Sequence, residues 1–112
     1  MYTDDAGRPW YDKDPNDTVE VGQVWADWLG ELGEAETLQG VVWTATTGLT
    51  VSGGAVNAEA RVIDGVTYPI GTVALITLSG GSVGNTYRVT CRATTTLGNI
   101  VDRSFWVRVV ER

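Results

Sequence analysis

The stretch from Gly84 to Val110 constrains the fold of this chain more than any other part of its sequence. It contains two arms, residues 84–96 and 100–110, joined at Leu97-Gly98-Asn99. Polar and apolar residues alternate in both arms, and a period of two places successive side chains on opposite faces of a β-strand. β-branched and aromatic residues favour strands, and a Gly-Asn pair tolerates the positive φ of a tight turn. The stretch therefore predicts a β-hairpin.

The alternation also assigns the two faces of this hairpin. The apolar face should point to the core and comprises Tyr87, Val89, Cys91, Ala93, Phe105, Val107 and Val109. The other face should point outward and includes Arg88, Thr90, Arg92, Thr94, Ser104, Trp106 and Arg108. Tyr87 closely follows the Gly84-Asn85 corner, at the start of a strand. In immunoglobulin-like sandwiches a tyrosine in this place bonds through its hydroxyl to nearby loop backbone, and we expect the same of Tyr87.

Glycine-rich turns divide the rest of the chain into further short strands. The expected strands cover residues 18–25, 37–45, 48–52, 57–63, 65–70 and 73–79. Asp64-Gly65 is a strong signal for a hairpin turn. Residues 26–36 have helix-like spacing, but Gly30 and Gly33 make a helix longer than about one turn unfavourable. Together with the final hairpin, this pattern predicts an all-β protein, an antiparallel immunoglobulin-like β-sandwich of about seven strands.

Charge is distributed unevenly along the chain, whose formal net charge is −6. Residues 1–36 hold ten acids and two bases, a net of −8, whereas residues 37–112 hold four acids and six bases, a net of +2. This balance argues against nucleic acid as a partner. Residues 1–17 are polar and lack periodicity, so we expect an extended acidic N-terminal arm ahead of a sandwich domain at residues 18–112. No apolar run is long enough to cross a membrane, so no membrane partner is expected.

The residue types that usually carry catalysis are scarce. The chain has no histidine, and Cys91 is its one cysteine, which has no histidine to activate it. Residues 12–17 space acids and an amide as a calcium loop does, but Asp17 and Gln23 stand where such a loop needs Gly and Glu. The sequence does not exclude a pair of carboxylates of the kind that catalyses glycoside hydrolysis, although most of the acids lie in the N-terminal third. We therefore predict no catalytic residue, no metal site and no cofactor.

Five tryptophans in 112 residues are unusual. Trp43 lies mid-strand and is expected to be the core tryptophan of the sandwich. Trp25 and Trp28 are expected to pack at one open end of it. Trp106 should point outward beside Arg108, which is the composition of an interface hot spot and also of a platform on which a sugar stacks.

The N-terminal arm and the final hairpin carry opposite charge. Residues 1–17 have a net charge of −3, with Trp10 and Tyr11 among their acids, and residues 84–112 have a net charge of +3. We expect the arm to pack on the hairpin face of an adjacent copy or partner, with both aromatics as anchors and the charges setting the register. The predicted interface residues are Trp10, Tyr11, Arg88, Arg92, Trp106 and Arg108.

A series of short motifs, in order, resembles a known protein family. The motifs are Lys13-Asp14-Pro15-Asn16-Asp17, Trp25-Ala26-Asp27-Trp28-Leu29, Trp43, Gly48-Leu49-Thr50, Leu78-Ser79-Gly80-Gly81, Thr86-Tyr87-Arg88-Val89-Thr90 and Arg103-Ser104-Phe105. They resemble small bacteriophage virion proteins described as fibre–tail adaptors, which are expected to have an immunoglobulin-like fold. The chain departs from their pattern at residues 62–72, which look inserted, and at Val24, where an acid is commoner.

This resemblance implies a non-enzymatic structural component of the virion, a tail or fibre-attachment adaptor made in the bacterial host cytoplasm. Its partners would be other virion proteins, and copies would form a homo-oligomeric ring. A carbohydrate-binding module and a capsid decoration protein are the alternatives.

Overall fold

The computed structural model describes residues 2–32 and 36–111. Its helix is α1 (Ala26–Leu32), which lies within residues 26–36, where a helical turn was expected. Positions 33–35 of that range lie outside the described residues. The strands are β1 (Tyr2–Thr3), β2 (Pro9–Lys13), β3 (Val19–Val24), β4 (Leu38–Ala45), β5 (Leu49–Val56), β6 (Arg61–Ile63), β7 (Val66–Tyr68), β8 (Val73–Gly80), β9 (Thr86–Thr95) and β10 (Ile100–Val109). The all-β prediction is therefore confirmed.

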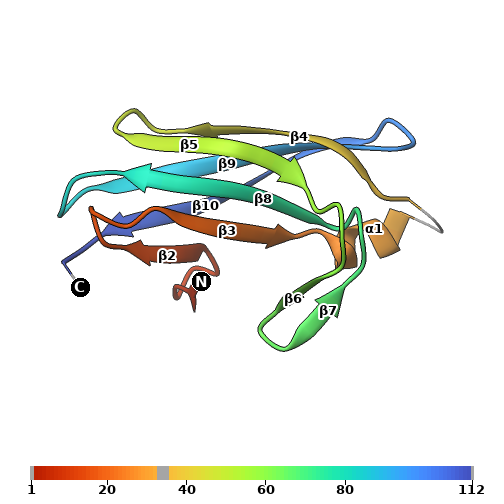
Figure 1. The fold of residues 1–112 in the computed structure, drawn as a ribbon, viewed down its shortest axis with the longest axis horizontal. Coiled ribbons are helices and arrows are strands. Elements are labelled where there is room, and N and C mark those ends of the chain that lie inside the picture. Colours follow the sequence, from red (N-terminus) through yellow and green to blue (C-terminus); the bar gives the residue numbers. More distant parts are fainter. Residues whose placement is uncertain (1, 33–35, 112) are drawn as a thin grey trace.

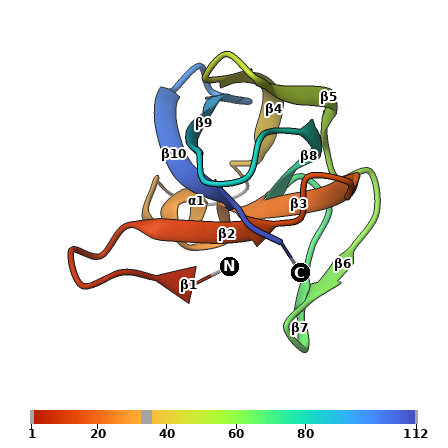
Figure 2. The ribbon, with the colours of Figure 1, turned by 90° about the vertical axis from the view of Figure 1, so that its left-hand side faces the viewer.

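Two sheets pack face to face, as Figure 1 shows. The larger has the strand order β1-β2-β10-β9-β4, and the smaller has the order β3-β8-β5. β6 and β7 pair as a separate ribbon that projects from the body (Figures 1 and 2). The larger sheet is called the large sheet below, and its face away from the smaller sheet is called the outer sheet face.

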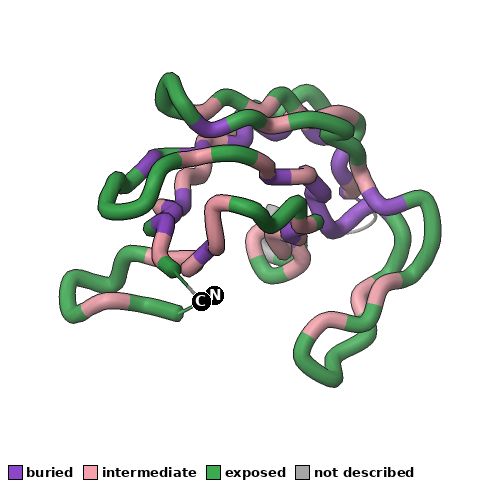
Figure 3. The backbone as a smooth tube through the Cα atoms, turned by 60° about the vertical axis from the view of Figure 1, so that its left-hand side comes forward, coloured by how far each residue is buried: buried purple, intermediate pink, exposed green. Residues whose placement is uncertain are grey.

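The final hairpin has the predicted faces. β9 and β10 pair antiparallel, with Val89 opposite Phe105 and Arg88 opposite Trp106. The seven residues assigned to the core are all buried, and Figure 3 shows such buried positions alternating along the strands. The Tyr87 hydroxyl accepts a hydrogen bond from the Ser82 backbone N–H at 2.9 Å, as the corner position predicts.

The core forms two adjoining clusters, and its fully buried tryptophan is Trp25. The prediction gave that place to Trp43, which is only partly buried and contacts both clusters. Trp43 lies on β4, the edge strand of the large sheet, so fewer neighbouring strands cover its ring. Gly54 of β5 leaves room for the inner part of this ring, which packs on Phe105 with a centroid distance of 6.1 Å. Trp25 instead directly precedes α1 and packs edge-on against Trp28.

Residues 9–13, expected in an extended arm, form β2 and pair in parallel with β10 of the same chain. Trp10 lies opposite Trp106, and Lys13 lies opposite Val109. Lys13 is fully buried, and its Nζ donates to the backbone oxygens of Asp14 and Gly80 at 2.8 Å each. Within one chain this segment therefore completes the large sheet, and its docking on an adjacent copy or partner stays a prediction.

The β6–β7 ribbon turns at Asp64-Gly65, as predicted, with φ angles of 51° and 79°. The buried Asn57 fixes its base, since its side chain donates to two backbone oxygens and accepts from the N–H groups of Thr72 and Val73. The ribbon folds back on the smaller sheet, where the Ile63 side chain lies over Gly22. The segment that looked inserted in the sequence is therefore anchored at both ends.

Candidate interaction face

The outer sheet face gathers the outward side chains of four neighbouring strands. On β9 and β10 these are the polar positions of the alternating arms, and the parallel register of β2 adds Trp10 and Asp12 beside them. β4 contributes Val42 and Thr44. The face therefore consists of Trp10, Asp12, Val42, Thr44, Arg88, Thr90, Arg92, Asp102, Ser104, Trp106 and Arg108.

Trp106 is the centre of this face. Its ring lies 6.2 Å from that of Trp10, centroid to centroid, at an angle of 36°. The guanidinium carbons of Arg8 and Arg88 lie 5.8 Å and 5.7 Å from its centroid. A cation within about 6 Å of an indole centroid is attracted by the negative charge on the ring face. The contacts therefore hold two arginines beside a half-buried tryptophan.

Asp4 fixes Trp10 and Arg8 in these positions. Its carboxylate accepts hydrogen bonds from Trp10 Nε1 at 2.8 Å and from Arg8 Nε at 2.9 Å, and also from the backbone N–H groups of Ala6 and Arg8. The Trp10 bond, the Arg8 backbone bond and the other contacts together lower the pKa of Asp4 to about 2. The carboxylate is therefore ionised at neutral pH and orders the loop between β1 and β2.

Arg108 and Asp12 form an ion pair at 3.0 Å beside the tryptophans. The Tyr2 hydroxyl donates to the other Asp12 oxygen at 2.8 Å, and this bond raises the pKa of Tyr2. A shallow depression of about 220 Å³ lies here, lined by Tyr2, Asp4, Trp10 and Arg108.

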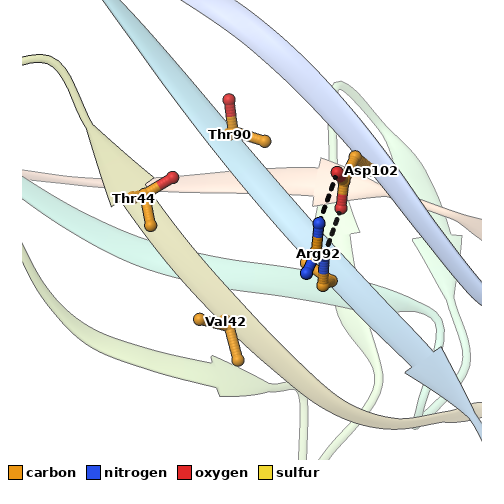
Figure 4. A pocket seen from close by; sticks show the side chains of 5 residues that line it. All are labelled: Val42, Thr44, Thr90, Arg92 and Asp102. Carbon is orange, nitrogen blue, oxygen red and sulfur yellow. Dashed lines mark hydrogen bonds and ion pairs between the residues drawn. The ribbon is translucent and has the colours of Figure 1, made fainter.

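A second depression, of about 250 Å³, lies over β9 towards β4 (Figure 4). On the side away from β4, Arg92 donates two hydrogen bonds to Asp102, at 2.8 Å and 3.1 Å. These bonds lower the pKa of Asp102 and raise that of Arg92. Val42 and Thr44 border the depression on the β4 side.

Arg88 differs from its neighbouring arginines. Its Nε donates to Ser104 Oγ at 3.2 Å, and the ion pairs among the described residues join other arginines to acids. Arg88 thus presents a positive charge that a carboxylate of another molecule can meet.

The structure brings together five of the six predicted interface residues. Arg88, Arg92, Trp106 and Arg108 share the outer sheet face with Trp10. Tyr11 points the opposite way and packs against the core of its own chain, because successive residues of a strand face opposite sides. Sequence reasoning missed Asp4 and Arg8; the signal that marks them is the acidic turn before Pro9, whose side-chain bonds organise the loop.

Two observations concern metal binding and thiol chemistry. They contain no group of three or more His, Cys, Asp or Glu that could hold a metal ion. Cys91 is buried, and burial raises the pKa of its thiol to about 12, so that it stays protonated. Across residues 2–32 and 36–111, no helix is long and apolar enough to cross a membrane.

Fold and face together define a small all-β protein whose distinguishing feature is an aromatic and arginine-rich sheet surface. The chain belongs to the family described as podophage GP4 fiber-tail adaptor protein gp77, whose model matches residues 13–108. The resemblance noted in the sequence is thereby confirmed. No curated protein matches the chain. The family match begins after Trp10, so Trp10 lies outside the matched range and Trp106 lies inside it.

Proposed function

We propose that this chain is a non-enzymatic structural component of a podophage virion, an adaptor at the tail or fibre attachment point. It docks to neighbouring virion proteins through the outer sheet face. The observation that carries this proposal is the cluster around Trp106, with Trp10 beside it and Arg8 and Arg88 on its ring. Tryptophan and arginine are the residues most enriched in interface hot spots, and the family is one of adaptors.

The arrangement of the face supports docking to a protein. Hot spots lie at the centre of an interface and are surrounded by polar groups that exclude water. Trp106 has this position, with the Arg92–Asp102 pair on one side and the Arg108–Asp12 pair on the other. The charges of these exposed pairs already have partners within the chain. We therefore expect them to contribute to the orientation of a docked protein more than to its affinity.

We infer that the sandwich is immunoglobulin-like. Its orders β3-β8-β5 and β10-β9-β4 correspond to the two sheets of that fold with the same crossover between them. The Tyr87–Ser82 bond at the start of β9 supports the same inference, because it has the form of a tyrosine corner. β1, β2 and the β6–β7 ribbon are then additions to a core of the remaining six strands.

We further propose that copies form a closed homo-oligomeric ring in the particle, since tail parts follow its rotational symmetry. The chain would be made in the host cytoplasm, whose reducing conditions suit a protein with one free, buried cysteine. Nucleic acid is not expected as a partner of a chain with a net charge of −6. A membrane is not expected as a partner because the apolar runs in the sequence are too short to cross one.

The carbohydrate alternative has weaker support. A sugar that stacks on an indole needs one free ring face. Trp106 is contacted by Trp10 and by two guanidinium groups, so one of these must move before a sugar could bind. A capsid decoration protein would have the same fold and differ only in where it sits on the particle.

The test is incorporation into virions. Trp106→Ala and Arg88→Ala should each reduce the amount of the protein that co-purifies with particles, by about tenfold for the tryptophan. Arg61→Ala is the matched control, since Arg61 lies on the ribbon, away from the face, and pairs with Glu20 of β3. Thermal melts of the purified variants show whether folding is retained. Normal incorporation of both face variants would refute docking through this face, and a position on the capsid by cryo-EM would favour decoration.

A further inference from the structure

The large sheet ends at β4, and the described residues place no hydrogen-bonded strand on its far side. The Thr46 backbone N–H donates to Arg88 O at 3.0 Å, towards β9. In an antiparallel pair the direction of backbone groups alternates from residue to residue. The N–H and C=O groups of Val41, Trp43 and Ala45 therefore point away from β9, to the open edge.

This edge lacks the features that normally protect a free strand. Natural proteins block such edges with charged side chains, prolines, bulges or covering segments. Residues 37–58 contain no Asp, Glu, Lys, Arg or Pro. The one irregularity of β4 lies between Leu38 and Gly40, so that the register is regular from Val41 to Ala45.

The other edges of the two packed sheets are less regular or carry charge. β1 has two residues and is followed by Asp4 and Asp5. β3 carries Glu20, paired with Arg61, and the ribbon covers it at Gly22. β5 is as free of charge and proline as β4, but its register shifts in the middle of the strand, between Ser52 and Ala55, whereas the shift in β4 lies at its start. The contrast marks β4 as the edge that is left available.

We propose that β4 accepts an extended, uncharged strand of a neighbouring virion protein, which continues the large sheet by one strand. This inference rests on the proposed adaptor function and specifies how the partner is held. Backbone hydrogen bonds along the edge supply binding, and alternate side chains of the added strand supply specificity. Absence of charge on β4 fits an uncharged strand, because a charged residue there would have no partner of opposite sign.

The depression in Figure 4 gives those alternate side chains a place to bind. An added strand would lie about 4.8 Å from β4. Its outward side chains would then stand beside Val42 and Thr44, which border the depression. Arg92 and Asp102 offer a donor and an acceptor on the far side, so a long polar, neutral side chain is favoured at this place. The added strand would also extend the outer sheet face without a break.

A second copy of this chain is a less suitable occupant. Two β4 strands paired antiparallel would form an isologous contact, in which both molecules bury the same surface. An adaptor joins unlike parts and needs different surfaces for each of them. We therefore assign the edge to a strand of a different protein.

The experiment uses the full chain and virions assembled without it. Ala45→Pro removes one outward N–H, while the ladder with β9 keeps its hydrogen bonds, and proline is tolerated on edge strands. Ala45→Gly keeps that N–H and is the matched control. Co-sedimentation with the particles should show binding weakened by about tenfold for the proline variant relative to the glycine variant. Melting temperatures of both variants show whether either has lost its fold.

A second measurement avoids mutation altogether. Amide hydrogen exchange of the unmodified chain, compared free and on the particle, should show new protection at Val41, Trp43 and Ala45. Val42 and Thr44, whose amides already face β9, should change little. Equal binding of both variants, or unchanged exchange at the three outward amides, overturns the inference. Concentration-dependent protection in the free chain also overturns it, because the occupant would then be a second copy. If the unmodified chain does not bind the particles, the proposed function fails instead.

Discussion

Cys91 shows how a single residue takes its chemistry from its surroundings. It lies on the inward face of β9, fully buried, and burial raises the pKa of its thiol to about 12. The thiolate is the reactive form of cysteine. At about pH 8 we expect no reaction with an aromatic disulfide reagent in the native protein and one thiol released per chain after unfolding in guanidinium. Rapid labelling of the native protein would show that β9 opens readily.

Asp4 should make the free energy of unfolding depend on pH in the acidic range. Its pKa falls from 3.8 to about 2 on folding, mainly because Trp10 Nε1 donates to it. A depressed carboxylate pKa contributes stability that is present above the unfolded value and is lost as the pH falls through the folded value. Between about pH 4 and about pH 2, the free energy of unfolding should therefore fall more steeply in the unmodified chain than in Asp4→Asn. Urea melts across this range measure the difference, and parallel curves would mean that the Trp10 bond is absent in solution.

At the scale of elements, packing between the sheets depends on glycines placed opposite large rings. A Cβ on Gly54 would lie 2.6 Å from Trp43 Cδ1, which is closer than real contacts allow. Gly54→Ala must push the Trp43 ring towards Phe105, and we expect a loss of about 1 to 3 kcal/mol in unfolding free energy.

Gly40→Ala is the control for this prediction. Gly40 lies on β4, and a Cβ built there meets nothing within 4 Å. Denaturant melts should place the midpoint of this variant close to that of the unmodified chain. A Gly54→Ala midpoint equal to that of Gly40→Ala would show that Trp43 has room to move, and that the two sheets are less tightly packed than the structure indicates.

At the scale of the whole molecule, the question is whether residues 1–17 are an arm or part of the fold. β2 pairs with β10 and covers one edge of the large sheet, so removing residues 1–12 should lower the melting temperature without unfolding the chain. The same deletion removes Trp10 and Arg8 from Trp106, whose fluorescence should shift to longer wavelength. The shift is identified by its loss in a Trp106→Phe background.

The predicted domain boundary at residue 17 is tested by a longer deletion. Removing residues 1–17 also removes Lys13, whose Nζ bonds to Gly80 O inside the protein. We expect this chain to melt at a lower temperature than the one lacking residues 1–12. Equal melting temperatures for both deletions and the intact chain would support an independent domain at 18–112.

The sequence by itself determined what depends on neighbours along the chain. The period of two set the faces of β9 and β10, and with them the outward position of Trp106, Arg88 and Arg108. The Asp64-Gly65 turn and the place of Tyr87 were also predictable, because a short turn has few conformations and specific residues that adopt them.

Only the tertiary structure decided which distant segments meet. Trp10 faces Trp106 because β2 joins β10 in parallel, across more than ninety residues. Opposite charge pointed to the final hairpin as the surface that residues 1–17 contact, but no local pattern indicated a parallel strand in the sheet of the same chain. The same holds for the choice of Trp25 over Trp43 as the buried tryptophan, which depends on the position of β4 at the edge of the large sheet. Local periodicity fixes the side of a strand on which a residue lies. The neighbour of that strand follows from the packing of the whole chain, which minimises exposed apolar area and unpaired backbone groups together.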